Sequence, residues 1–529
     1  MDLDVVTLSR IQFAMTAMYH FLFVPLTLGL SVMLAIMETV YVMTNRPIWR
    51  QMTKFWGVLF GINFVMGVAT GIVMEFQFGM NWSYYSHYVG DVFGAPLAIE
   101  GMMAFFLEAT FVGLFFFGWD RLSKVGHLIT TWAVALGSNL SALWILIANG
   151  WMQYPVGAFF NPETMRMEVS HFYDVLFNTV AQAKFVHTVS AGYVTASIFV
   201  LGVSAWYLLK GRHVDLAKRS MTVAASFGLA ASLSVVVLGD ESGYLSGEHQ
   251  KMKLAAIESM WDTEPAPASF TLFGIPDQDD RATLYAIRIP MLMGLIGTRS
   301  LDTPIEGINQ LVASAEKRVR DGIVAYDLLQ RIRAAGPQGA APDDLAAFRT
   351  HAENLGYALL LLSYVDDPRT ATDEQINQAA WDTVPEVAPI FWSFRIMVGL
   401  GFFFIILMTI FFFQSARRRL DQNRFLLKLA VFAIPLPWIA VEMGWFVSEF
   451  GRQPWVIEGV LPTAVAVSDL GASTVLLTIL GFFAIYTVLL IIEMRLMLKA
   501  IRKGPQPDTA PEAPLTTPNL SQRLAVTER

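Results

Sequence analysis

Long apolar runs dominate this chain of 529 residues and limit the folds that it can adopt. About nine of them are about 20 residues long or longer, the length that an α-helix needs to cross a bilayer. In hydrocarbon the backbone N–H and C=O groups must bond within the segment, so each run is expected to be a helix. The predicted spans are 11–43, 55–78, 95–119, 127–149, 184–209, 220–239, 390–413, 426–448 and 471–497. The sequence therefore predicts an all-α integral membrane protein with about nine transmembrane helices.

Lysine and arginine are unevenly distributed among the connections between these spans. They occur between spans one and two, three and four, five and six, and seven and eight, and again after span nine, whereas residues 81–94 contain neither. Basic loops stay on the cytoplasmic side of a membrane. We therefore expect the N-terminus outside and the C-terminus in the cytoplasm. The acidic start, Met1-Asp2-Leu3-Asp4, does not resemble a cleaved signal peptide.

A polar, acid-rich stretch separates spans six and seven. Apolar residues at helical spacing over 301–335 predict a small helical lobe within it, and proline and glycine between 335 and 342 predict a break. No internal repeat is visible, which argues against a transporter built from duplicated halves. The predicted organisation is 1–239 for helices one to six, 240–389 for a large outer hydrophilic insert, 390–500 for helices seven to nine, and 501–529 for a disordered cytoplasmic tail.

The composition narrows the chemistry that the chain can perform. Hydrophobic residues make up 54% and charged residues only 15%, which excludes a basic nucleic-acid binder and an ordinary soluble enzyme. Cysteine is absent, which excludes disulfides, cysteine-ligated iron–sulfur clusters, covalently attached c-type haem and a thiolate copper centre. Any redox cofactor must therefore be held by histidine, methionine, carboxylate or similar ligands.

Few residues inside the spans are potential metal ligands. Of eight histidines, only His20 and His187 lie within spans and away from the cytoplasmic ends. Each can be an iron ligand or merely an interhelical hydrogen-bonding residue. Met397, near the outer end of span seven, could complete a His–Met haem site, although most membrane methionines serve packing. Arg395 could balance a haem propionate or reach the head groups as an interfacial residue. A haem–copper core or a bis-histidine diheme cytochrome would need more intramembrane histidines. The candidate haem ligands in this chain are His20, His187, Met397 and also Glu449.

Span three carries two carboxylates, one near the outer end of the span and one farther into the membrane. Glu100 and Glu108 are eight residues apart, which is two turns along and about 80° around a helix, so one cavity could contain both. Carboxylates inside a membrane are costly, and a proton relay or substrate path is the default hypothesis. Span four adds polar residues that could extend this path or hold helices together, and the second interpretation is favoured for its serines: Ser138, Asn139, Ser141 and Asn149.

The stretch 444–455 ends span eight with charged and aromatic residues together. It contains Trp445, Glu449, Arg452 and Trp455. A carboxylate toward the centre of a membrane helix costs roughly 2.5–3.5 kcal/mol and less near the interface. An interfacial belt, with tryptophan anchors and Arg452 reaching the head groups, is the alternative.

A second charged pair lies in the insert, where 251–258 predicts the start of a helix. Lys253 and Glu258 are five residues apart, about 140° around a helix, so they do not form an ordinary i,i+4 salt bridge. From this spacing alone, a solvated helix face is the favoured interpretation.

These motifs together resemble subunit I of the cytochrome bd-type ubiquinol oxidases, in the form with a long outer quinol loop. The resemblance covers the chain except its tail. It is carried by Gly451-Arg452-Gln453-Pro454-Trp455 with Glu449 and Trp445, by Phe394-Arg395-Ile396-Met397, by Gly94-Ala95-Pro96-Leu97-Ala98-Ile99-Glu100-Gly101, by Asn149-Gly150-Trp151-Met152-Gln153-Tyr154-Pro155, and by Lys253-Leu254-Ala255-Ala256-Ile257-Glu258.

The resemblance implies a role for each candidate residue. His187 and Met397 are then the ligands of a low-spin haem b, with Arg395 and Arg452 beside the cofactors. His20 is assigned to haem d, or a b-type haem in its place, and Glu449 to a high-spin haem b. The remaining implied roles are Glu100 beside the dioxygen site, Glu108 and Ser141 in a proton channel, Lys253 and Glu258 at the quinol site, and Trp445 between the haems.

The implied reaction is oxidation of ubiquinol or menaquinol on the outer side and reduction of dioxygen to water with cytoplasmic protons. This generates proton motive force without pumping. The implied surroundings are the lipid bilayer of a bacterial cytoplasmic (inner) membrane, a second large membrane subunit (subunit II) and small single-helix subunits, with no nucleic acid.

Two alternatives stay open from the sequence. One is a proton-coupled transporter whose buried carboxylates bind substrate, which predicts no haem. The other is a b-type cytochrome anchor that passes electrons between quinone and a soluble partner. The anchor needs only His187, Met397 and the insert.

Overall fold

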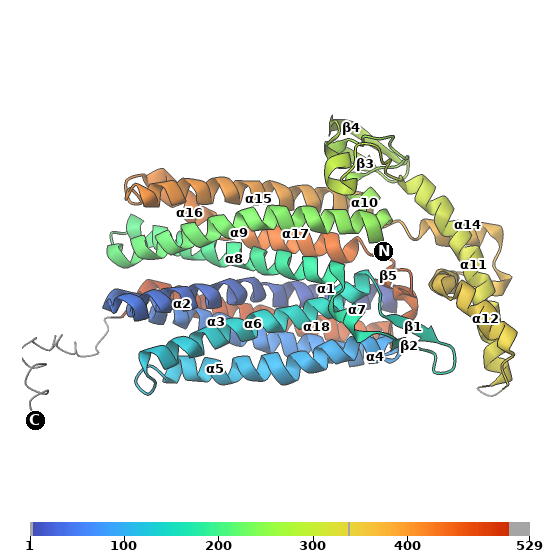
Figure 1. Ribbon diagram of the computed structural model, residues 1–529, viewed down its shortest axis with the longest axis horizontal. Coiled ribbons are helices and arrows are strands. Elements are labelled where there is room, and N and C mark those ends of the chain that lie inside the picture. The colour runs from blue at the N-terminus through green and yellow to red at the C-terminus, as the bar shows by residue number, and fades with distance from the viewer. Residues whose placement is uncertain (1–3, 337–338, 507–529) are drawn as a thin grey trace, which may run out of the picture.

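Helices that run the length of the molecule make up most of this computed structural model, which describes residues 4–336 and 339–506 (Figure 1). Within those residues, nine helical segments are long and apolar enough to cross a membrane, so the predicted fold class is confirmed. They are Val5–Thr44, Pro47–Met80, Ser83–Phe117, Lys124–Gln153, Phe172–Leu209, Val214–His249, Val387–Ala416, Arg424–Phe450 and Ala472–Lys503.

The first span is two helices, α1 (Val5–Phe21) and α2 (Val24–Thr44), because Pro25 lies at the start of α2 and has no N–H to continue the hydrogen-bond ladder. Side chains also donate to carbonyls at the break. Trp438 Nε1 donates to Leu22 O at 2.7 Å, and Asn63 Nδ2 donates to Phe23 O at 2.7 Å. The break is therefore satisfied by residues of two other spans, and it places the last turn of α1 inside the bundle.

The third span is also irregular. It consists of α4 (Ser83–Ile99), a π-helical segment η1 (Glu100–Phe105) and α5 (Phe106–Phe117). The predicted loop over 81–94 is therefore mostly helix, because hydropathy marks only the apolar part of a helix that extends beyond it. The π-helical segment begins at Glu100, one of the two carboxylates of this span, and changes the angular offset between them.

Most of the other spans are single helices. The short helix α7 precedes α8 in the fifth span, and the eighth span is divided into two helices near Pro435 and Pro437. The elements are α3 (Pro47–Met80), α6 (Lys124–Gln153), α7 (Phe172–Leu176) with α8 (Thr179–Leu209), α9 (Val214–His249), α15 (Val387–Ala416), α16 (Arg424–Phe432) with α17 (Leu436–Phe450), and α18 (Ala472–Lys503).

Helix α8 is at the centre of the bundle, with 78% of its most apolar stretch buried. Small residues allow close packing here: a Cβ atom on Gly29 of α2 would lie 2.5 Å from the carbonyl oxygen of Gly192 in α8. By contrast, only 11% of the corresponding stretch of α18 and of the third span is buried. The enclosed part of α8 is its middle and inner portion, where most residues from Val189 to Tyr207 are buried.

The insert lies at one end of the bundle, together with the start of α1 (Figure 1). Helix α9 continues to His249, past residue 240 where the predicted insert begins. The predicted helical lobe is confirmed as α11. The insert comprises α10 (Lys251–Glu258), η2 (Gly294–Thr298), α11 (Ile308–Ala335), α12 (Pro342–His351), η3 (Ala352–Asn354), α13 (Leu355–Leu359), η4 (Leu360–Ser363), η5 (Pro368–Thr370) and α14 (Asp373–Trp381), with one β-hairpin.

Strands are confined to short connections at this same end (Figure 1). The described residues form three antiparallel two-stranded sheets, and a short helix η6 (Thr463–Val465) follows the last of them. The strands are β1 (Ala158–Asn161) with β2 (Arg166–Val169), β3 (Phe270–Asp277) with β4 (Ala282–Ile289), and β5 (Trp455–Ile457) with β6 (Leu461–Pro462).

The last helix, α18, ends at the opposite side of the bundle. Tyr207, near the end of α8, donates a hydrogen bond of 2.6 Å from its hydroxyl to the carbonyl of Ile501. The helix extends to Lys503, slightly into the predicted tail. Most of that tail, from residue 507 onward, lies outside the described residues.

Candidate functional site

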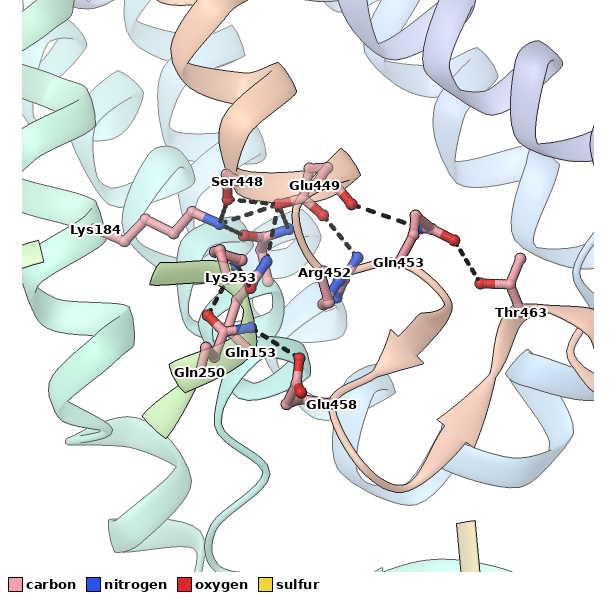
Figure 2. A network of polar contacts seen from close by, with 11 residues as sticks. Gln153, Lys184, Gln250, Lys253, Ser448, Glu449, Arg452, Gln453, Glu458 and Thr463 are labelled. Carbon is pink, nitrogen blue, oxygen red and sulfur yellow. Dashed lines mark hydrogen bonds and ion pairs between the residues drawn. The ribbon is translucent and has the colours of Figure 1, made fainter. Parts of the chain in front are cut away.

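Glu449, in the last turn of α17, lies at the centre of a polar cluster at the insert end of the bundle (Figure 2). Two cations contact its carboxylate: Arg452 at 2.6 Å and Lys184 of α8 at 3.0 Å. Side-chain donors from three further residues complete the set: Asn149 Nδ2 at 3.2 Å, Gln153 Nε2 at 3.1 Å and Ser448 Oγ at 3.0 Å. These five donors, two of them cationic, favour an anionic carboxylate on a side chain that is 32% exposed.

Arg452 faces the interior, contrary to the interfacial belt that the sequence left open. The residue is only 5% exposed. One terminal nitrogen binds Glu449, whereas its Nε and Nη1 atoms are buried without a partner among the described residues. Buried guanidinium donors are rarely left unpaired, so an anionic group fits this position.

Lys253 of α10 joins the insert to this cluster. Its Nζ donates to Gln153 Oε1 at 2.6 Å and to Gln250 Oε1 at 2.9 Å (Figure 2). Lys253 is 5% exposed, so the predicted solvated helix face is wrong. The reason is tertiary packing, because α10 is covered by α11, α15 and the Trp455 region. Burial and, to a lesser degree, the positive charge of Lys184 together lower the pKa of Lys253 to about 7.

Glu258, at the other end of α10, faces a different neighbour. Its carboxylate is 3.4 Å from Arg395 of α15 and accepts the Thr271 N–H at 3.1 Å. Burial raises the pKa of Glu258 to about 7, and Arg395 opposes this shift. Arg395 also donates to the Ile257 carbonyl at 2.8 Å and to the Thr271 carbonyl. The structure thus directs Arg395 to the insert, and Lys253 and Glu258 lie in separate sets of contacts.

His187 of α8 and Met397 of α15 each lie against a glycine of a neighbouring helix, α9 and α17 respectively. Nδ1 of His187 is buried and has no hydrogen-bond partner among the described residues. A Cβ on Gly239 would lie 3.2 Å from the His187 ring, and one on Gly444 would lie 3.0 Å from Met397 Sδ. One turn beyond Gly239, a Cβ on Gly243 would meet nothing within 4 Å. A buried imidazole nitrogen without a partner fits a haem ligand.

His20 lies in the last turn of α1, next to the break in the first span. Its Nδ1 is 2.9 Å from Thr70 Oγ1, and the Thr70 hydroxyl lies 2.9 Å from the Met66 carbonyl, to which it donates. Because the hydroxyl has one proton, this network assigns the donor role to His20 Nδ1. Nε2 then carries the free lone pair that a metal ligand requires.

Trp445 lies between the surroundings of His20 and those of Glu449. Its ring centroid is 5.0 Å from that of Phe21, the residue after His20. On the other side, Lys184 Nζ, which binds Glu449, is 5.0 Å from the Trp445 ring. The predicted position of Trp445 between two cofactor ligands is compatible with these contacts.

The carboxylates of the third span each pair with a serine of α6. Ser141 Oγ donates to Glu100 at 2.6 Å, and Ser138 Oγ donates to Glu108. Sequence reasoning assigned Ser141 together with Glu108 and treated Ser138 as packing. The π-helical segment that begins at Glu100 was not visible in the sequence pattern, and the resulting partners could not be read from a regular helix.

Several polar residues of the cluster were not named as site residues from the sequence. The sequence does contain an indication for Lys184, because a lysine inside a predicted span requires a partner. It contains no indication for Gln153, Gln250 and Glu458, since amides and carboxylates are common at helix ends and in loops. Glu442 of α17 is also buried, and both carboxylate oxygens lack partners among the described residues.

Buried cations and carboxylates, with histidines and a methionine inside the spans of a helical bundle, fit a membrane-bound redox protein. Comparison with known proteins agrees with this class. The family model described as cytochrome bd terminal oxidase subunit I matches residues 8–505. The chain belongs to the cytochrome bd terminal oxidase subunit I family. Its haem cofactors follow from that membership, and the transporter alternative is set aside.

Individual relatives extend over nearly the whole chain. The cytochrome bd-II ubiquinol oxidase subunit 1 of Escherichia coli is 53% identical over 502 residues, covering 95% of this chain and 97% of the relative. The cytochrome bd ubiquinol oxidase subunit 1 of Bacillus subtilis is 35% identical over 522 residues, covering 98% of both. The solved bd oxidase of Geobacillus thermodenitrificans shares the fold, with a TM-score of 0.76 at 24% identity over 95% of this chain and 99% of that one.

Proposed function

We propose that the buried cluster around Lys253 and Glu449 couples quinol oxidation to dioxygen reduction. At the level that the family establishes, the protein is a subunit of a terminal quinol oxidase, a quinol:O2 oxidoreductase. The observation that carries the finer proposal is the continuous chain Lys253–Gln153–Glu449. It connects the insert, where quinol binds, to a carboxylate with the surroundings of a cofactor ligand.

Haems bound here supply one-electron transfer and oxygen chemistry. His187 and Met397 hold a low-spin haem b, and Glu449 a high-spin haem b. His20 holds haem d, or a b-type haem in its place. Arg452 offers two unpaired buried nitrogens to anionic groups of these cofactors. Arg395, whose guanidinium is bound to the insert, stabilises the cofactor region through that contact.

Protons for water formation enter from the cytoplasmic side through the third and fourth spans. Glu108 with Ser138 and Glu100 with Ser141 form two successive carboxylate–serine pairs. Glu100 is the member next to the dioxygen site. Because quinol releases protons outside while dioxygen consumes cytoplasmic protons, the reaction generates proton motive force without pumping.

The protein is a multi-pass component of a bacterial inner membrane and acts in a complex with other subunits. Its N-terminus faces outward and its C-terminus the cytoplasm, which the basic loops support. The further subunits are a second large membrane subunit and small single-helix subunits. The quinol is ubiquinol or menaquinol. An electron-transfer anchor without oxygen reduction would leave His20, Glu100 and Glu449 without a role.

A dithionite-reduced minus oxidised visible spectrum of the purified complex tests this proposal, together with quinol-driven oxygen uptake. Wild type should show low-spin b absorption, a far-red band if haem d is present, and oxygen uptake. His187→Ala should lose the low-spin b signal alone. The exposed His171→Ala is the matched control and should match wild type. Assembled protein with no haem signal, or with haem but no oxygen uptake, would contradict the proposal.

A further inference from the structure

The hydrogen-bonded chain at Lys253 also continues away from Glu449. Gln250, which accepts from Lys253, donates from Nε2 to Glu458 Oε2 at 3.0 Å (Figure 2). Glu458 lies in the turn between β5 and β6, and its backbone N–H is bound to the Met152 carbonyl at 3.0 Å. Lys253 is therefore connected to two carboxylates, one on each side: Glu449 through Gln153, and Glu458 through Gln250.

The middle of this chain is buried and its two ends are not. Lys253 and Gln250 are each 5% exposed, whereas Glu449 and Glu458 are both partly exposed. The ends differ in place, since Glu449 lies on membrane-spanning helix α17 and is bound by Arg452 and Lys184, whereas Glu458 lies in a turn beyond that helix. Glu258, the other carboxylate on α10, is 2% exposed and paired with Arg395. Of the carboxylates near Lys253, Glu458 is thus the one that is joined to Lys253, lies outside the membrane-spanning helices and is partly exposed.

The helical lobe holds the turn that carries Glu458. Tyr357 of α13 packs against Trp455 with ring centroids 5.0 Å apart. A Cβ on Gly356 would lie 2.3 Å from the carbonyl oxygen of Gly459, so the α13 backbone directly contacts this turn. Glu458 is consequently fixed relative to α10 rather than placed on a free loop.

The groups that face Glu458 come from four elements. Lys253 of α10, Arg318 of α11 and Arg452 after α17 are cationic, and Tyr357 of α13 is titratable. Burial raises the pKa of Glu458, whereas the Gln250 hydrogen bond and the three cations oppose that shift. A raised pKa brings a carboxyl group toward the range in which it can both accept and release protons near neutrality.

We propose that Glu458 receives the protons that quinol releases at Lys253 and passes them to water outside the membrane. This inference rests on the proposed quinol site. Oxidation of one quinol breaks two O–H bonds and releases two protons and two electrons. The neutral Lys253 amine takes the protons one after the other, and the two electrons leave for the oxidase's own acceptors and finally dioxygen. Each proton passes from Lys253 to Gln250 Oε1 while a proton on Gln250 Nε2 passes to Glu458 and then to solvent; the amide returns to its usual tautomer, and the neutral amine is restored before the second O–H bond breaks.

The test compares Glu458→Gln with wild type in the assembled oxidase. Quinol-driven oxygen uptake is measured from about pH 5.5 to 9, alongside reoxidation by dioxygen of enzyme that dithionite has reduced. Glu458→Gln should lower kcat for quinol by about tenfold or more, the scale of a lost proton acceptor. The wild-type rate should rise with pH as Lys253 and Glu458 lose their protons. Glu458→Gln should change this profile by losing the part that belongs to Glu458, and should keep KM and reoxidation unchanged. Glu353→Gln, an exposed carboxylate that pairs with Arg318 in the same lobe, is the control and should match wild type.

Unchanged kcat and pH profile in Glu458→Gln would overturn the inference while leaving the proposed function intact. Absence of quinol-driven uptake in wild type would instead refute the proposed function. If Glu458→Gln fails to assemble, Gln250→Met decides the matter, because it cuts the chain and keeps both charged groups. Wild-type kcat and pH profile in Gln250→Met would overturn the inference, and the same loss as expected for Glu458→Gln would support it.

Discussion

Arg395 of α15 and Glu258 of α10 form a buried ion pair, 3.4 Å between Nη2 and Oε2, that fastens the insert to a membrane helix. The Arg395 guanidinium also holds backbone carbonyls at the end of α10 and on β3. One side chain therefore fixes two insert elements against the bundle.

Arg395→Gln should loosen this fastening strongly. Removing one member of a buried pair leaves the other charge without its partner, at a cost of about 3–5 kcal/mol. Hydrogen exchange of the β3 amides should become much faster, and quinol oxidation should fall. Arg288→Gln, which removes an exposed pair with Glu264, is the control and should change exchange little. Equal protection of the β3 amides from exchange in both variants would contradict the role of Arg395 in holding the insert.

The insert should become less stable as pH rises through the acidic range. The pKa of Glu258 is raised to about 7 in the folded protein, so the folded state holds its proton where the unfolded chain has lost it. Stability therefore falls between about pH 4.5 and 7, by about 3 kcal/mol at most. Thermal unfolding of the insert across this range measures the slope. Glu258→Gln should flatten it, and an unchanged slope would show that another group is responsible.

Glu108→Leu should block the supply of protons to the oxygen site. Turnover with quinol should drop by about tenfold or more, since a mid-membrane relay would lack its titratable group. Proteoliposomes that report oxygen uptake and membrane potential together provide the measurement. Ser138→Ala, which removes only the partner hydroxyl, should cause a smaller loss. Full turnover and potential in Glu108→Leu would show that the path lies elsewhere.

Thr70→Val should weaken cofactor retention at His20 without removing the ligand. Thr70 accepts the Nδ1 hydrogen bond that keeps Nε2 free, and loss of such a supporting contact costs about 10–100-fold in affinity. The haem content per protein, measured after detergent dilution, should fall for Thr70→Val and fall further for His20→Ala. Thr39→Val, in the same bundle but remote from His20, serves as the comparison. Wild-type haem content in His20→Ala would exclude this residue as a ligand.

Gly29→Ala should destabilise the bundle. The new methyl group would lie 2.5 Å from the Gly192 carbonyl and force α2 away from α8, and such overpacking costs about 1–3 kcal/mol. The thermal midpoint in detergent should decrease. Gly113→Ala, where a Cβ meets nothing within 4 Å, should leave it unchanged. Equal thermal midpoints in the two variants would show that the close approach of α2 and α8 at Gly29 does not limit stability.

The sequence predicted the spans well because hydropathy depends on local composition. It also marked His20, His187 and Glu449 as candidates, since ligand-type residues inside spans are rare. It failed where structure depends on distant contacts. The spacing of Lys253 and Glu258 predicts a solvated helix face, because no pattern in the local sequence shows that α11 and α15 cover α10. The pairing of Glu108 with Ser138 likewise depends on a π-helical segment that leaves no compositional trace.

The enclosed position of α8 has an evolutionary consequence. A helix that contacts neighbours on every side and lets α2 approach at Gly192 has little freedom to accept new side chains. Its small residues should therefore drift slowly among relatives. The outward face of α18, which meets few neighbours in this chain, should diversify quickly under selection only for apolar character. The rate of sequence change around each helix would then record its depth in the protein.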